Sequence, residues 1–75
     1  MAHRHRVLAA FGSNLRGERE RRKFTQERLA EKADLDPSYI SGIERGVRNP
    51  SILSVVRIAN ALGTTVSDLS RGIEE

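Results

Sequence analysis

The sequence has no cysteine and no tryptophan, and it holds one methionine and two prolines among its 75 residues. Without cysteine, disulfide bonds and thiolate metal sites are excluded, and the composition fits a reducing compartment. No run of residues is long and apolar enough to span a membrane, and the N-terminus lacks the apolar core of a signal peptide. We therefore expect a cytoplasmic protein with no membrane partner.

Groups suited to catalysis are also scarce. Both histidines, His3 and His5, stand near the N-terminus, away from any serine that they would activate. They have no acidic neighbour that would complete a metal site, and no glycine-rich phosphate loop follows a strand. These absences argue against an enzyme, and we expect no metal, no cofactor and no small-molecule effector.

What the sequence does contain is basic charge on a short chain. A chain of this length predicts one domain over residues 1–75, without a separate catalytic or ligand-sensing module. So short a chain buries a limited share of its surface, and dimerisation would stabilise it. The net charge of +3 lies mainly in the first third, where a solvated helix face and a nucleic-acid surface are about equally plausible readings.

Two short helices joined by a tight corner are predicted between Thr25 and Arg45. Thr25 and Asp36 are good N-caps, and Pro37 follows Asp36 at a first helical position, where its missing N–H costs nothing. Apolar residues recur at three- and four-residue steps, and Leu35 is expected to fill the corner. The inward stripes comprise Leu29, Ala30 and Ala33, then Ile40 and Ile43, and Gly46 is placed to end the second helix.

Three further helices are expected around this pair. The first covers residues 7–22, after a flexible arm at residues 1–6, and it places Leu8, Phe11 and Leu15 on one side. The fourth runs from about 51 to 62, the fifth is capped by Thr64 or Thr65, and residues 70–75 form a loose tail. The fold class is therefore all-α, a compact bundle of five helices. The expected inward stripe of the fourth helix comprises Ile52, Val55, Ile58, Ala59 and Leu62.

The central stretch resembles the helix-turn-helix of the Cro/CI-type (XRE) family of DNA-binding transcriptional regulators. The resemblance is carried by Thr25, Gln26, Leu29, Ala30, Leu35, Ile40, Ser41, Glu44, Arg45 and Gly46. Residues 36–45 are also similar to the controller proteins of restriction–modification systems, a branch of that family. The resemblance implies a lambda-repressor-like domain and a homodimer, with two units in successive major grooves of a two-fold symmetric operator on double-stranded DNA.

The same resemblance implies roles for individual residues. An ion pair is expected between Arg19 and Glu44, and dimerisation through the fifth helix and the end of the fourth. The residues expected to contact DNA are Thr25, Gln26, Ser38, Tyr39, Ser41, Gly42, Arg45, Arg48, Asn49 and Ser51. The residues expected at the dimer interface are Leu53, Val56, Val66 and Leu69.

Base readout is expected to be sparse, because no glutamine or arginine fork stands on the third helix. Arg48 is the best candidate to reach a guanine, although a solvated loop arginine is an equal alternative. Tyr39 has the alternative of covering the edge of the core, and Ser41 that of packing. Two other functions stay open: an antitoxin or immunity regulator with a protein partner, and an adaptor that binds only protein.

Overall fold

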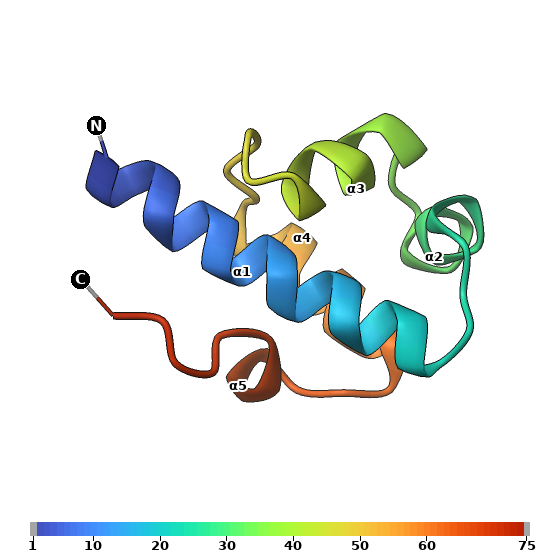
Figure 1. The fold of residues 1–75 in the computed structure, drawn as a ribbon. Coiled ribbons are helices and arrows are strands. Elements are labelled where there is room, and N and C mark those ends of the chain that lie inside the picture. The colour runs from blue at the N-terminus through green and yellow to red at the C-terminus, as the bar shows by residue number, and fades with distance from the viewer. Residues whose placement is uncertain (1, 75) are drawn as a thin grey trace.

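The computed structural model describes residues 2–74, with side chains from Arg6 onward. Within this range the chain forms five helices and no strand (Figure 1). They are α1 (Ala2–Arg21), α2 (Gln26–Ala33), α3 (Pro37–Glu44), α4 (Ile52–Leu62) and α5 (Val66–Leu69). α1 crosses the molecule, with α3 on one side of it and α5 on the other, and α4 packs against α2 and α5. The expected all-α, five-helix class is confirmed.

Every helix contributes at least one fully enclosed apolar side chain to a single core. Burying each such side chain stabilises the fold by about 1.5–3 kcal/mol, so the five short helices hold one another. The largest fully buried side chains are Leu15, Leu29, Ile40, Ile43, Ile58 and Leu69. The predicted caps are present as well: Thr25, Asp36 and Thr65 accept amide hydrogen bonds, and Gly46 has a positive φ of 77°.

The expected flexible arm at residues 1–6 is wrong for residues 2–6, because α1 already begins at Ala2. No proline or glycine precedes Gly12, and each residue added to an existing helix gains a backbone hydrogen bond. At its other end α1 stops at Arg21, and Lys23 takes a left-handed φ of 60°, a conformation that usually favours glycine. Met1 lies outside the described residues.

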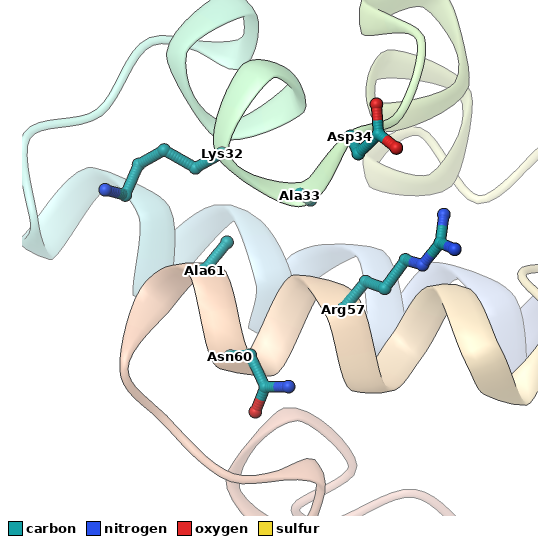
Figure 2. Close-up of a pocket in the computed structure, with 6 residues that line it drawn as sticks. All are labelled: Lys32, Ala33, Asp34, Arg57, Asn60 and Ala61. Carbon is teal, nitrogen blue, oxygen red and sulfur yellow. The ribbon is translucent and has the colours of Figure 1, made fainter.

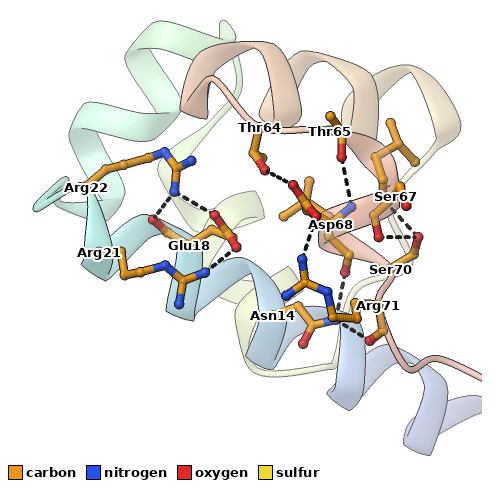
Figure 3. Close-up of polar contacts among 12 residues, drawn as sticks. Asn14, Glu18, Arg21, Arg22, Thr64, Thr65, Ser67, Asp68, Ser70 and Arg71 are labelled. Atoms are coloured by element: carbon orange, nitrogen blue, oxygen red, sulfur yellow. Dashed lines mark hydrogen bonds and ion pairs between the residues drawn. The ribbon is translucent and has the colours of Figure 1, made fainter.

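The expected loose tail is also wrong for residues 70–74. The side-chain amide of Asn14 donates hydrogen bonds of 2.9 Å to the carbonyl oxygens of both Leu69 and Arg71 (Figure 3). Ile73 packs against the core beyond them. One hydrogen bond from α1 thus holds the last residue of α5, and a second, together with the packing of Ile73, holds the segment after it. Glu75 lies outside the described residues.

A buried carboxylate lies near the C-terminal end of α1. Glu18 is almost fully enclosed and forms ion pairs with Arg21 and with Arg22, whose Nη1 is 2.6 Å from Oε1 (Figure 3). A buried charge is tolerated when it is paired and hydrogen-bonded, as here. The two arginines therefore account for an acidic residue at a position on α1 that faces inward.

The inward stripe of α4 differs from the expected one at its first position. Ile52 is 78% exposed, and the buried residue of the first turn is Ser54 instead. Ile52 lines an apolar groove with Phe11, Val55 and Val66, and nothing in the described chain covers it. The remaining four stripe residues are buried as expected.

Candidate nucleic-acid interface

The start of α2 is fixed both by its own cap and by a bond to α3. The hydroxyl of Thr25 accepts a hydrogen bond of 3.0 Å from the amide of Arg28. The side-chain amide of Gln26 donates to Oε1 of Glu44 at 2.9 Å. Exposed Thr25 and half-buried Gln26 thus stand beside the C-terminal end of α3, at a helix N-terminus that favours anions.

An ion pair connects α1 to the same end of α3. Nε of Arg19 lies 2.6 Å from Oε2 of Glu44, and Nη2 lies 3.1 Å from Oε1. The side chains are only 12% and 3% exposed, and Nη1 also donates to the carbonyl oxygen of Phe24 at 2.6 Å. Hydrogen bonding to Glu44 raises the pKa of Arg19, and burial opposes this only in part. The pair expected from the sequence is present, so Arg19 is committed to holding the helices together.

The outer side of α3 carries small hydroxyl side chains. Asp36 accepts hydrogen bonds from the amide and the hydroxyl of Ser38, at 2.8 and 2.6 Å. These two bonds keep the pKa of Asp36 below its ordinary value. Ser41 follows one turn later and lies 3.4 Å from Nε of Arg45. Ser38, Ser41 and Arg45 therefore form a polar stripe at three- and four-residue spacing, ending in a cation.

Tyr39 does not stand on the outer side of α3. Its ring packs against the core, its hydroxyl donates to Oγ of Ser54 at 3.2 Å, and it accepts from the amide of Ser51 at 3.3 Å. Tyr39 therefore covers the edge of the core, which was the alternative to a DNA contact. Its partner Ser54 was missed by sequence reasoning, although a serine inside an apolar stripe is a signal for a buried polar contact.

Gly42 is likewise not open to a ligand. The residue is buried, because the side chain of Arg48 lies over its Cα, and a Cβ placed there would be 2.3 Å from Cγ of Arg48. The expectation that Gly42 faces DNA is therefore corrected: the chain turns back after Gly46 and puts Arg48 in that place. Arg48 itself is exposed, as are Asn49 and Ser51.

The residues expected at a dimer interface divide into two groups. Leu69 is fully buried within its own chain, between α1 and α4, so its placement at an interface is wrong. The single turn of α5 has one inward position, and Leu69 occupies it. Leu53, Val56 and Val66 are exposed, as is Ile52, and we call these four apolar residues of α4 and α5 the α4–α5 apolar patch.

A second surface hollow lies between α2 and α4, lined by Lys32, Ala33, Asp34, Arg57, Asn60 and Ala61. Figure 2 shows that the side chain of Lys32 extends away from those of Asp34 and Arg57. The cations therefore do not converge on a common point, and we assign no ligand to this hollow. Among the described residues no three histidine or acidic side chains gather in a way that would hold a metal ion, and no helix there could cross a membrane.

Comparison with known proteins gives a consistent set of matches. A family model described as "Helix-turn-helix" matches residues 15–69. The control protein C.MunI of Mycoplasma sp is 41% identical over 70 residues, which cover 92% of this chain and 95% of that protein. The immunity repressor protein of Bacillus phage phi105 is 46% identical over 75% of this chain, but the match spans only 39% of the repressor.

Solved structures agree with these sequence matches. The restriction–modification controller protein C.AhdI from Aeromonas hydrophila superposes with a TM-score of 0.82 at 40% identity, covering 83% of this chain and 94% of that one. The controller protein C.Esp1396I, solved as a tetramer in complex with its natural 35 base-pair operator, superposes with a TM-score of 0.74. It is 39% identical, over 79% of this chain and 78% of that one.

Proposed function

This chain belongs to the helix-turn-helix family, and from that premise we propose that it is a transcriptional regulator that binds double-stranded operator DNA. In this proposal it acts in the cytoplasm, as a homodimer on a two-fold symmetric site, and performs no catalysis of its own. The N-terminal residues of α3 face base edges in the major groove, and the start of α2 faces the phosphate backbone.

The observation that carries the proposal is the charge and exposure around α3. The polar stripe of Ser38, Ser41 and Arg45 is exposed or half-exposed, and Arg48 stands beside it, also exposed. Glu44, the acidic residue at the C-terminal end of α3, is paired with Arg19, and its side chain is only 3% exposed. A surface of hydroxyls and exposed guanidinium groups on a packed helix pair matches a phosphate-lined groove.

The relatives support the same class of activity. C.MunI and C.AhdI are named as control or controller proteins, and C.Esp1396I was solved with its operator. Because this chain is about 40% identical to them over most of its length, we propose that it acts as a member of the restriction–modification controller branch. Which gene is regulated is a separate question from the binding mode.

The α4–α5 apolar patch supports the homodimer. Ile52 and Leu53 are 78% and 61% exposed, Val56 and Val66 are 38% and 41% exposed, and Ile52 and Val66 line the same apolar groove. Several large apolar side chains exposed together on a small domain are typical of an interface. Pairing two copies through this patch would relate the two α3 helices by a two-fold axis. To enter successive major grooves, the two helices must then lie about 34–36 Å apart, one turn of DNA.

The test is selection of tight sites from a randomised duplex pool, followed by binding measurements at two salt concentrations. We expect an enriched palindrome, with an affinity that falls steeply as salt rises. Arg45→Ala should lower the salt slope by about one unit. The matched control is Arg71→Ala, an exposed arginine in the segment after α5, which should leave the slope unchanged. Figure 1 shows α5 on the side of α1 opposite α3. Weak binding without enrichment would overturn the proposal and favour a protein partner.

A further inference from the structure

We infer that Gly42 and Tyr39 are positioning residues, which together hold the side chain of Arg48 ready to read a base edge. The inference rests on the proposed function, since it names the residues that determine specificity at the same interface. We call the ring of Tyr39 and the Cα of Gly42, which carries no side chain, the Arg48 support.

The first part of the support is itself fixed at both ends. Tyr39 belongs to α3, and its ring packs against the core. Its hydroxyl accepts a hydrogen bond from the amide of Ser51 and donates one to Oγ of Ser54. The hydroxyl of Ser51 in turn donates to Oγ of Ser54 at 3.0 Å. The ring therefore spans from α3 to the start of α4 and cannot swing freely.

Arg48 lies on that ring. Its Cζ is 5.2 Å from the ring centroid of Tyr39, within the range of a cation–π contact. A cation–π contact supplies no hydrogen-bond acceptor to the guanidinium, whose N–H donors lie in its plane and can bond a base edge. A guanidinium presented in this way can donate two parallel hydrogen bonds to O6 and N7 of a guanine.

The second part of the support is the absence of a side chain at residue 42. The amide of Arg48 donates to the carbonyl oxygen of Gly42 at 3.2 Å, which sets where the arginine leaves the backbone. Its Cγ then lies where a Cβ on residue 42 would be, with 2.3 Å between the two positions. Any larger residue at 42 must therefore displace the arginine near the base of its side chain.

The consequence for recognition is preorganisation. A free arginine on a loop loses rotamer entropy when it binds a base, whereas a supported one has lost part of it beforehand. The α3 helix carries no glutamine or arginine of its own, so a supported Arg48 would supply the main base-specific contact. Gly42 and Tyr39 would then influence specificity without touching DNA.

The DNA test compares variants on the site selected by the wild-type protein, and on that site with single base pairs changed. Arg48→Ala should lose about tenfold discrimination at one base-pair position. Gly42→Ala should lose discrimination at the same position, while it keeps the wild-type salt slope because no charge is removed. The double variant should lose no more than Arg48→Ala alone, since both changes act through one side chain.

The matched control is Gly17→Ala on α1, where an added Cβ meets nothing within 4 Å. It should keep the full base preference. A thermal unfolding curve of Gly42→Ala, monitored by circular dichroism, should show that the variant is folded. Alanine has a higher helix propensity than glycine, and the side chain of Arg48 can move into solvent. Loss of preference in a folded Gly42→Ala variant is thus separated from loss of structure.

A second readout needs no DNA, because Tyr39 is the only tyrosine of the chain. Burial of the ring raises its pKa, but hydrogen bonds with Ser54 and Ser51 and the charge of Arg48 together lower the pKa of the phenol. Ultraviolet titration should show a higher phenol pKa in Arg48→Ala and in Gly42→Ala than in the wild type. Gly17→Ala should titrate like the wild type.

The outcomes separate the two proposals. An unchanged phenol pKa in Gly42→Ala, or an unchanged base preference, would overturn the Arg48 support while leaving DNA binding in place. A shifted phenol pKa in a protein that selects no site would overturn the proposed function, and the reading role of Arg48 with it. A shifted pKa together with coupled loss of one base preference would establish both.

Discussion

Gly12 of α1 lies directly against the backbone of Ile43 in α3. A Cβ on Gly12 would be 2.3 Å from the carbonyl oxygen of Ile43 and 2.5 Å from that of Glu44. No side chain fits in that space, so the two helices approach as closely as their backbones allow. This contact fixes the distance between α1 and α3, and therefore the position of the proposed DNA-binding surface relative to the core.

Gly12→Ala should therefore destabilise the fold, by about 1–3 kcal/mol, because backbone atoms must move apart to admit the methyl group. Gly17→Ala, in the same helix but with open space around it, should instead stabilise the protein by up to about 1 kcal/mol. Urea unfolding of the two variants measures both effects. A Gly12→Ala variant as stable as Gly17→Ala would show that α1 and α3 can separate without cost.

Removing the charge of Glu44 should cost more than removing an exposed charge. In Glu44→Gln the guanidinium of Arg19 stays buried without its carboxylate, and breaking such a pair costs about 3 kcal/mol. The control is Glu31→Gln, which breaks an exposed pair with Arg28 and should cost under about 1 kcal/mol. Thermal unfolding of both variants compares them, and equal losses would contradict a structural role for the buried pair.

Acid sensitivity should be traceable to Asp68. A hydrogen bond from Thr64 lowers the pKa of this carboxyl below its ordinary value of 3.8, and Arg71, with Nη2 2.5 Å from Oδ1, lowers it further (Figure 3). Because the folded pKa is the lower one, this contribution to stability is complete above about pH 4 and is lost as pH falls through the folded pKa.

The unfolding temperature of the wild type should therefore fall as pH drops below about 4, and that of Asp68→Asn should fall less. Glu74→Gln, which removes an exposed carboxylate near the chain end and leaves the Asp68 contacts intact, is the control and should behave like the wild type. Identical acid profiles for Asp68→Asn and the wild type would show that the contacts of Asp68 do not couple folding to protons.

The sequence predicts best those features that depend on neighbouring residues. The caps at Thr25 and Asp36 and the turn at Gly46 are local, and each is found where its residue type indicates. The errors concern residues whose surroundings come from distant segments. Gly42 is covered by a loop that turns back over α3, and Leu69 by α1 and α4. Periodicity gives the face of a helix, but not what lies over that face.

The assignment of DNA contacts shows the same limit. Arg48 and Tyr39 were both selected as contacts from the sequence, but the ring that was expected to touch DNA instead supports the arginine. A local pattern places both residues near the end of α3, whereas their relation depends on the loop and on Ser54 in α4. Such a division of roles within one site is visible only in three dimensions.

The final prediction concerns the α4–α5 apolar patch. Leu53→Glu places a charge within this patch, where it would be buried without a partner in a homodimer formed through it. The single chain should tolerate the change, because Leu53 is 61% exposed and an acidic residue in the first turn of a helix is favourable. Sedimentation should therefore show a folded monomer where the wild type is a dimer.

The matched control is Val47→Glu, since Val47 is equally exposed but lies in the loop after α3, outside the patch. It should remain a dimer. The Leu53→Glu variant should bind a full palindrome no more tightly than a half-site. In a dimer the second unit binds at a high effective concentration once the first is bound, and a monomer lacks this advantage. If Leu53→Glu still sediments as a dimer, the interface lies elsewhere, and the half-site spacing inferred from this patch no longer holds.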